Sequence, residues 1–367
     1  MVRLGLICDP DFPTRIAKNL AEVLPDKLQH RGEDPASWSV EVVSDPLAAG
    51  RTSSEEILAA TRDQLRHHGW DYAVCLTDLP LRRHKHPVLA DIDTDHRVGA
   101  VSLPALGGLQ PHRRARQMVL QALDDVGATT RQPPGGSQHE LRSKLTEILA
   151  PVRRYTPQHD RIDIRYTATA GRGRVRLLTG MVRSNSPWQL VLGLSSALAA
   201  ALATSAFGLT SSTVWQIGDL LGPWRKLVVT FGVIALMTTW LVLSHNLWEQ
   251  RHRIGDREQR FLYNASTVLT LGIGVGCLYA ALFLINLTAT VFLIDAALLQ
   301  SKLGHPTGFG SYLVLAWGAT SMGVAAGALG SGLESDSAVR QAAYGYREEQ
   351  RRAEQQELDR NARQQDR

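Results

Sequence analysis

Cysteine is scarce in this chain of 367 residues, and the three cysteines lie far apart in the sequence. No two of them form a CxxC pair, which argues against a zinc ribbon or a thioredoxin-like redox site. The sequence also lacks a P-loop, a GxSxG nucleophile elbow and a GxGxxG dinucleotide fingerprint. We therefore predict no catalytic residue, cofactor or metal ligand, and we expect Cys8, Cys75 and Cys277 to be small buried side chains.

Long apolar runs are missing before Pro187 and frequent after it. Because a transmembrane helix needs about 20 mostly apolar residues, the sequence predicts a soluble first half and a membrane-embedded second half. We expect four spans, at about Trp188–Leu209, Leu227–Trp248, Asn264–Ile294 and Tyr312–Leu333.

The third apolar run is too long for one upright helix. From Asn264 to Ile294 a helix would extend roughly 45 Å, whereas the hydrocarbon core of a bilayer is roughly 30 Å thick. The helix either tilts strongly, or it leaves the membrane near Asn286 and continues along the surface to Leu303. We favour the second arrangement, because polar residues interrupt the run from Asn286 onward.

Charged residues are absent from the centres of all four predicted spans. Ion pathways and proton-coupled carriers usually contain such groups, so a packed scaffold is favoured over a transporter or channel, which stays an alternative. Small residues recur four apart in two of the spans, which permits close packing within one bundle or between copies in a homo-oligomer. These residues are Ala319, Gly323 and Gly327 in the fourth span, and Ala197, Ala201 and Ser205 in the first.

The net charge of +5 comes mostly from arginines that cluster beside the apolar runs. With four spans, every arginine-rich segment falls on one side, which the positive-inside rule assigns to the cytoplasm. The apolar stretch at the N-terminus stops at Asp9 and is too short for a signal peptide. We therefore predict a multi-pass protein of the plasma membrane with both termini in the cytoplasm. Nucleic acid is not an expected partner, because no basic stripe is interleaved with aromatic residues.

Residues 1–130 alternate between strand-like and helix-like patterns. The expected elements are strands at Val2–Cys8, Trp38–Ser44, Asp71–Thr77, Val88–Asp91 and Gly99–Leu103, and helices at Pro13–His30, from Ser53 or Ser54 to His68, and at Arg113–Val126. Their order predicts a three-layer cytoplasmic α/β domain with a mixed sheet. We divide the rest into a linker, an amphipathic helix (Gln138–Arg154) and a membrane-proximal basic segment at 131–186, an all-α bundle of four transmembrane helices at 187–333, and a charged cytoplasmic helix or tail at 334–367.

Polar residues stand at the ends of several predicted strands. Open α/β sheets bind ligands at the carboxyl edge of their parallel strands, so these residues are candidates for a small-ligand or partner site. The candidates are Asp9, Asp45, Thr77, Asp78, Asp91 and Ser102. Their pattern does not nominate a catalytic triad.

Potential metal ligands are densest between His84 and His96, where histidines and carboxylates alternate. Their spacing matches no strong ligand pattern, so a solvated polar loop is favoured over a metal site.

A basic, amphipathic stretch precedes the first predicted span. Its arginines could face lipid head groups while its apolar side chains point inward. The alternative is a last strand or helix packed on the soluble domain. The arginines are Arg172, Arg174, Arg176 and Arg183.

Two resemblances bear on the fold. The segments VCLTDLP, AVSLPALG, GMVRSNSPW, LYNASTVLTL and GALGSGLESDSAVRQAAYGYR resemble an uncharacterised family of actinobacterial four-span membrane proteins. Some members carry the label methylenetetrahydrofolate dehydrogenase, which this sequence does not support. The strand run DYAVCLTD…PVLADID…VGAVSLPALG is also faintly similar to archaemetzincin-like zinc peptidases, but the helix that follows it has no HExxH motif.

Three functions stay open at this stage. The favoured one is a non-enzymatic membrane-anchored sensor, adaptor or scaffold whose α/β domain binds a ligand or a cytoplasmic protein. The second is a membrane-bound enzyme with its site at the strand carboxyl edge. The third is a small transporter or channel.

Overall fold

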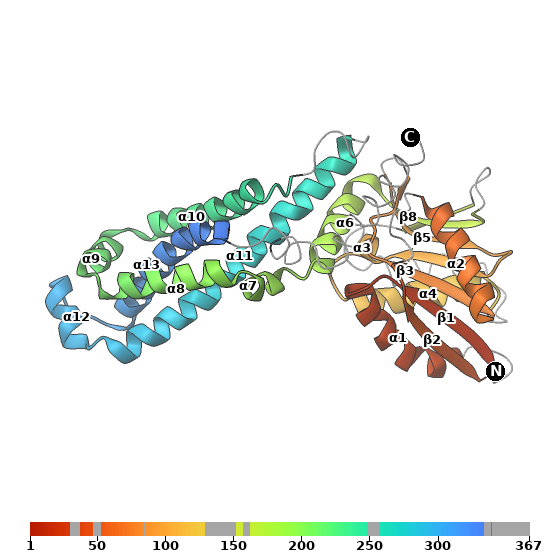
Figure 1. Cartoon of the computed structure of the whole chain (residues 1–367), viewed down its shortest axis with the longest axis horizontal. Helices are drawn as coiled ribbons and strands as arrows, with labels where there is room; N and C mark the ends of the chain where they lie inside the picture. The colour runs from red at the N-terminus through yellow and green to blue at the C-terminus, as the bar shows by residue number, and fades with distance from the viewer. Residues whose placement is uncertain are drawn as a thin grey trace, which may run out of the picture. The chain divides into compact units, whose positions relative to one another are not determined.

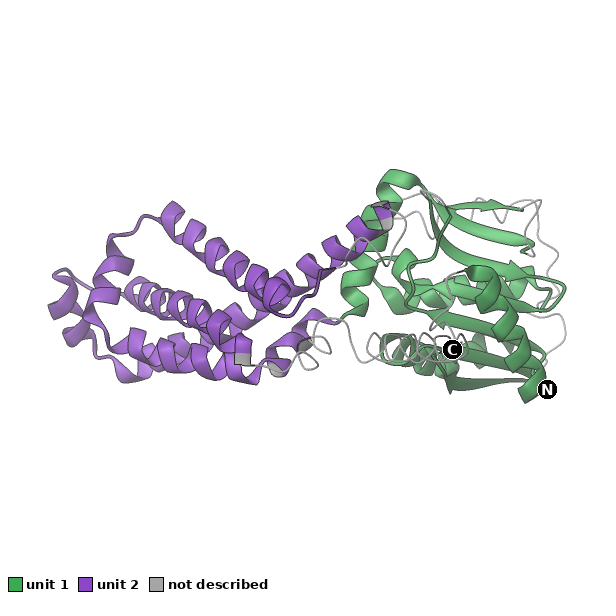
Figure 2. Cartoon of the chain, turned by 45° about the horizontal axis from the view of Figure 1, so that its top comes forward, with its two compact units in different colours: residues 1–185, 346–367 green, residues 186–345 purple. Residues whose placement is uncertain are grey.

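A computed structural model of the chain describes residues 1–29, 37–46, 53–83, 86–128, 152–156, 162–248, 257–333 and residue 339. The chain forms two compact units, residues 1–185 with 346–367 and residues 186–345, shown in green and purple in Figure 2. The boundary at Asn185 and Ser186 adjoins the predicted start of the membrane half. The expected helix at Gln138–Arg154 lies largely outside the described residues, and its last three residues belong to a strand, Val152–Tyr155, instead of a helix. His84, the predicted linker at the start of 131–186 and nearly all of 334–367 also lie outside the described residues.

The first unit contains a mixed eight-stranded sheet in the order β2-β1-β3-β6-β5-β8-β7, with β4 paired to β5 (Figure 1). The strands are β1 (Val2–Cys8), β2 (Trp38–Ser44), β3 (Tyr72–Thr77), β4 (Arg82–Arg83), β5 (His86–Asp93), β6 (Val98–Ser102), β7 (Val152–Tyr155) and β8 (Ile164–Ala168). Neighbours from β2 to β6 are parallel, whereas β5, β8 and β7 pair antiparallel. The segment expected to link the domains therefore adds β7 and β8 to this sheet.

Among the described residues, five helices accompany the sheet. They are α1 (Phe12–Gln29), α2 (Ser54–His68), α3 (Leu103–Leu106), α4 (Pro111–Asp125) and α6 (Ala170–Ser184). Residues of α2 share a buried cluster with Val98 of β6, whereas the backbone of Gly99 faces Ala122 of α4. Because successive strand residues point to opposite faces, Val98 and the position of a Cβ on Gly99 lie on opposite faces of β6.

Local sequence signals explain where α2 begins and ends. The Ser53 side chain accepts a hydrogen bond from the Glu56 amide, and Gly69 ends the helix in the left-handed conformation. The indole of Trp70 then packs against Gly5 of β1, where any Cβ would collide with the ring. Glycine is thus required in the middle of a buried strand, because the aromatic ring occupies the space of a side chain.

The second unit is entirely helical among the described residues. Its elements are the 3₁₀ turns Pro187–Gln189 and Ser331–Leu333, α7 (Leu190–Gly193), α8 (Ser195–Thr210), α9 (Ser212–Leu220), α10 (Pro223–Ser244), α11 (Arg257–Leu293), α12 (Ala296–Leu303) and α13 (Phe309–Gly330). In the part of the chain described, three helices are long and apolar enough to cross a membrane, and α8 with α9 makes a fourth if this pair, bent by 84°, counts as one span.

The third apolar run differs in detail from our expectation. Helix α11 passes Asn286 without a break and ends at Leu293, where Asp295 caps the separate helix α12 through the Ala297 amide (2.8 Å). Asn286 is buried, and its Nδ2 donates to Thr320 Oγ1 of α13 (2.9 Å). The helix therefore does not break at Asn286, where a neighbouring helix satisfies the polar side chain. Where the run leaves the membrane stays a prediction.

Small residues bring α8 and α13 together. A Cβ added at Gly323 would meet the Ser205 hydroxyl and the Ala201 carbonyl oxygen, and one at Gly327 would lie 3.0 Å from the Ala197 carbonyl oxygen. The two small-residue faces predicted from the sequence thus lie against each other within one chain.

Candidate functional site

The carboxyl ends of four parallel strands meet at one edge of the sheet. Because β2, β1, β3 and β6 run in the same direction, Asp45, Asp9, Thr77 with Asp78, and Ser102 all stand at this edge. The structure thus brings five of the six predicted residues to the edge that we expected.

Asp9 is the buried centre of this edge. Its Oδ2 accepts a hydrogen bond from the Asp78 amide (3.3 Å), and its main-chain oxygen accepts one from Thr14 Oγ1 (2.9 Å). Thr14 Oγ1 also lies 3.0 Å from Ser44 Oγ. These contacts tie the loops after β1, β2 and β3 together.

The hydroxyl groups at the edge bind backbone. Ser102 Oγ donates to the Leu79 carbonyl oxygen (2.6 Å), and Thr77 Oγ1 accepts from the Leu79 amide (3.0 Å). Both side chains are fully buried, so their role is to fix the turn after β3. Asp45, which accepts from Gln64 Nε2 (3.2 Å), and Asp78 are half-buried.

Asp91 lies apart from the other candidates, because β5 runs antiparallel to β6 and Asp91 pairs with Ala100 inside the sheet. Its carboxylate accepts two hydrogen bonds from Arg165 of β8, from Nε (2.6 Å) and Nη2 (3.0 Å). The Asp91 side chain is fully buried and that of Arg165 is 6% exposed. This bidentate pair joins two strands and is unavailable to a ligand.

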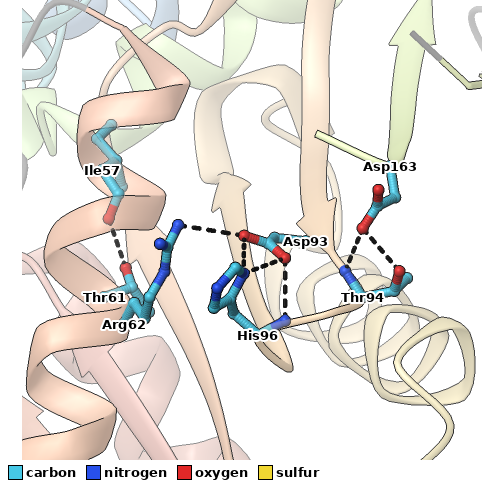
Figure 3. A network of polar contacts seen from close by, with 7 residues as sticks. All are labelled: Ile57, Thr61, Arg62, Asp93, Thr94, His96 and Asp163. Carbon is cyan, nitrogen blue, oxygen red and sulfur yellow. Dashed lines mark hydrogen bonds and ion pairs between the residues drawn. The ribbon is translucent and has the colours of Figure 1, made fainter. Parts of the chain in front are cut away.

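A second polar network surrounds the carboxyl end of β5, at the opposite edge of the sheet (Figure 3). Asp93 accepts from His96 Nδ1 (2.9 Å) and from Arg62 Nη2 of α2 (3.3 Å). Beside it, the Asp163 carboxylate accepts from the Thr94 amide (2.7 Å) and hydroxyl (2.6 Å). Burial raises the pKa of Asp163, but the hydrogen bonds from Thr94 and from the Asp95 amide, together with the charge of His96, outweigh it and hold this pKa below its ordinary value.

These contacts engage most of the potential metal ligands around β5. Asp91 binds Arg165, Asp93 binds Arg62 and His96, and His86 Nδ1 lies 3.2 Å from the Ala168 carbonyl oxygen. Within the described ranges, no group of three histidine, cysteine or acidic residues is placed to hold a metal ion.

The basic segment before the membrane half forms α6, which packs on α3. A Cβ at Gly180 would collide with the Pro104 carbonyl group, so the two backbones are in direct contact. Arg172 and Arg183 are exposed and Arg174 is half-buried, whereas Arg176 is only 2% exposed. Arg176 therefore packs on the α/β unit, as the alternative interpretation expected. The lipid-facing role of the other three arginines stays a prediction.

Arg176 meets Arg114 of α4 in a cluster that the sequence interpretation missed. Both guanidinium groups donate to the Leu106 carbonyl oxygen, from Arg114 Nη1 (2.6 Å) and Arg176 Nε (3.1 Å). Burial, and to a lesser extent the charge of Arg114, lowers the pKa of Arg176 to about 10. A signal was available: Gly173, Leu177 and Gly180 share the helix face of Arg176, which marks that face as the packed one.

Polar side chains in the second unit connect its helices. Trp317 Nε1 of α13 donates to Thr230 Oγ1 of α10 (2.9 Å), and the Tyr279 hydroxyl of α11 lies 2.9 Å from Ser321 Oγ of α13. With the Asn286–Thr320 bond, these contacts join three helices through uncharged groups. Such bonds act as specific glue between helices in an apolar environment.

No protein-family model matches the chain, and no curated protein or solved structure matches it either. The geometry of the two units is therefore the basis on which we infer a function.

Proposed function

We propose that this chain is a membrane-anchored sensor or adaptor, in which a three-layer cytoplasmic α/β domain binds a ligand or partner and a four-span bundle anchors it. The observation that carries the proposal is the division of the chain into an α/β unit with a polar strand edge and a helical unit with apolar helices of membrane-spanning length.

The surface of the helical unit supports its role as an anchor. Large apolar side chains are exposed along its long helices, including Phe231 (67%), Leu243 (69%) and Phe292 (84%). Water would disfavour such a surface, whereas lipid tails accept it. Trp224 at the start of α10 and Trp248 just beyond its end are also exposed, as expected for interfacial aromatic residues.

Hydrogen bonds inside the helical unit favour a role as membrane anchor over a role as ion pathway. Its buried polar groups, such as Asn286 with Thr320, bond helix to helix through uncharged side chains. An ion that crosses the membrane must be coordinated in turn by polar groups along its path, whereas these side chains are hydrogen-bonded to a neighbouring helix.

Topology is the first test of this proposal. In intact spheroplasts, a protease-sensitive tag at the C-terminus should be protected, and a tag inserted at the exposed Gly304 between α12 and α13 should be cleaved. Inverted vesicles should give the reverse pattern. Cleavage of the C-terminal tag from outside would overturn the cytoplasmic placement of the α/β domain.

Binding is the second test. The full chain, purified in a mild detergent, is analysed by mass spectrometry for proteins and metabolites that remain bound. A sensor or adaptor should retain a stoichiometric companion, and recovery of the chain alone in repeated preparations would contradict the proposal.

An enzyme at the carboxyl edge is the second candidate, because Asp78 and Asp45 are half-buried carboxylates close to the buried Asp9. Turnover of a retained metabolite by the wild-type chain, lost in Asp78→Asn and kept in the exposed-site variant Asp63→Asn, would favour the enzyme over the sensor.

A further inference from the structure

Two positive charges share one neutral acceptor in the α/β unit. Arg114 of α4 and Arg176 of α6 both donate to the Leu106 carbonyl oxygen. In the portion of the chain that is described, no carboxylate lies within ion-pairing distance of either guanidinium. Like charges in one site repel each other, and a single carbonyl dipole compensates only part of that cost.

Arg176 lacks a full set of hydrogen-bond acceptors. Its side chain is 2% exposed, and its Nη2 is buried without a hydrogen-bond partner. Buried charges in proteins are ordinarily paired and hydrogen-bonded, since the desolvation of an unpaired guanidinium is costly. The missing acceptor is therefore best supplied from outside the chain, by a group that carries negative charge.

The backbone beside the two arginines is shaped for close approach. Gly107 has φ +88°, and a Cβ there would lie 2.9 Å from both Arg114 Nη1 and Arg176 Cγ. The loop after it leads into α4, whose first turn contains no acidic residue and whose N-cap, Gln110, makes no side-chain capping bond. A helix N-terminus with uncapped amides favours an anion through its hydrogen-bond donors and its dipole.

Further basic groups surround this end of α4. The pKa of His112 is lowered first by burial and then by the positive charges of Arg183 and Arg15. Residues of α1, α4 and α6 thus contribute to one positive field, which would draw an anion toward the site.

We propose that Arg114, Arg176 and the N-terminal end of α4 form a binding site for a phosphate-type oxyanion. The planar fork of arginine matches the oxygens of such a group and binds two of them at once. The site follows the carboxyl end of β6, in the same unit as the proposed sensor site. A phosphate-type oxyanion would then be the ligand of the sensor, so the biological role of the site rests on the proposed function. The phosphate belongs either to a soluble ion or metabolite, or to a lipid head group.

Thermal unfolding in the presence of inorganic phosphate tests the site. The full chain in a neutral detergent is melted in rising phosphate and in chloride of equal ionic strength. We expect a saturable rise in Tm of about 5 °C in phosphate alone, because a ligand that binds only the folded state stabilises it. Arg176→Met should remove this rise, and Arg172→Met, at an exposed position on the same helix, should keep it.

A purely structural role for Arg176 makes different predictions. It predicts the same melting curve in phosphate and chloride for the wild type, and that result overturns the proposal. Loss of the phosphate effect in Arg172→Met overturns it too, since the effect would then be a general one of charge. If Arg176→Met does not fold, Arg114→Gln, at a half-buried position, should also remove the rise in Tm in phosphate. A rise that persists in Arg114→Gln would overturn the proposal.

Lipid nanodiscs distinguish the two sources of phosphate. A response to inorganic phosphate that disappears with phosphatidylglycerol but persists with phosphatidylcholine identifies an anionic lipid head group as the occupant. A response that persists in both identifies a soluble phosphate. These melting experiments are independent of the topology and copurification tests, so the site and the proposed function can fail separately.

Discussion

Ser205 of α8 donates a hydrogen bond across 3.2 Å to the main-chain oxygen of Ala319 on α13, 114 residues later in the sequence. The bond is possible because small residues on both helices allow their backbones to approach. The small-residue faces are therefore covered within a single copy of the chain. The homo-oligomer that we considered would have to use another face of the bundle.

Replacement of Gly323 by alanine should destabilise the helical unit. The added Cβ would meet the Ser205 hydroxyl and the Ala201 carbonyl oxygen, which belongs to a helix backbone and cannot move alone. We expect a loss of about 1–3 kcal/mol in the free energy of unfolding, measured by the helical circular dichroism signal during SDS titration in detergent.

The matched control is Gly232→Ala on α10, where no atom lies within 4 Å of the added Cβ. It should be neutral or stabilising by up to about 1 kcal/mol, because alanine favours helix more than glycine does. Equal effects at the two positions would contradict the packing of α8 on α13.

Removal of one partner from the Asp91–Arg165 pair should strongly destabilise the α/β unit. Arg165→Met leaves a fully buried carboxylate without its cation, at a cost of about 3–5 kcal/mol. The double variant Asp91→Leu with Arg165→Met should recover most of this loss, because two apolar side chains need no charge compensation. Chemical denaturation followed by the fluorescence of Trp70 and Trp38 measures both variants.

Arg154→Met serves as the control for that experiment. Arg154 pairs with Asp125 at 3.2 Å, but its side chain is 38% exposed, so the free energy of unfolding should fall by less than about 1 kcal/mol. A loss as large as that of Arg165→Met would mean that burial does not decide the strength of these pairs.

Asp125 should make the α/β unit less stable as the pH rises. Burial raises the pKa of its carboxyl group, and the hydrogen bond from the Tyr166 hydroxyl (2.6 Å) and the charge of Arg154 offset only part of this rise. Folding therefore favours the protonated form. This contribution is fully present below the unfolded pKa of about 3.9 and is lost as the pH rises through the raised folded pKa. Melting temperatures across this window should fall less steeply in Asp125→Asn than in the wild type.

Asp163 should have the opposite dependence on pH. Burial raises its folded pKa, but the hydrogen bonds from Thr94 and the Asp95 amide and the charge of His96 together lower it by more, so folding favours the ionised form. Its contribution is present above about pH 3.9 and is lost as the pH falls through the lowered folded pKa. Asp163→Asn should lower Tm at neutral pH and converge with the wild type in acid. Parallel profiles for Asp125→Asn and Asp163→Asn would contradict both assignments.

Local patterns were sufficient to find most elements of the α/β unit. The strands Val2–Cys8 and Trp38–Ser44 have the predicted bounds, and α2 is capped by Ser53, one of the two serines between which the sequence left the choice open. Apolar alternation, capping residues and glycine act within a few residues of one another, so the sequence records them directly. The apolar helices of the second half were found for the same reason: length and composition define them without any partner.

The candidate site was only partly accessible to such reasoning. Asp9 and Asp78 could be placed at one edge, because parallel strands share their direction and each residue follows its own strand. Asp91 could not be excluded from that edge until the antiparallel pairing of β5 was known. Nor does any local pattern reveal that Arg165, from the segment between the two predicted domains, binds Asp91 across the sheet.

The sequence alone determined that the chain has an α/β half and an apolar helical half, because the hydrophobic pattern and the lengths of apolar runs are local properties. The tertiary structure decided which polar residues are buried and bonded to other parts of the chain. It turned Arg176 from an expected lipid-facing residue into a buried neighbour of Arg114, and it placed α8 against α13 within one chain. The physical reason is that burial, charge pairing and helix contact depend on residues far apart in the chain, whose distances only the folded backbone sets.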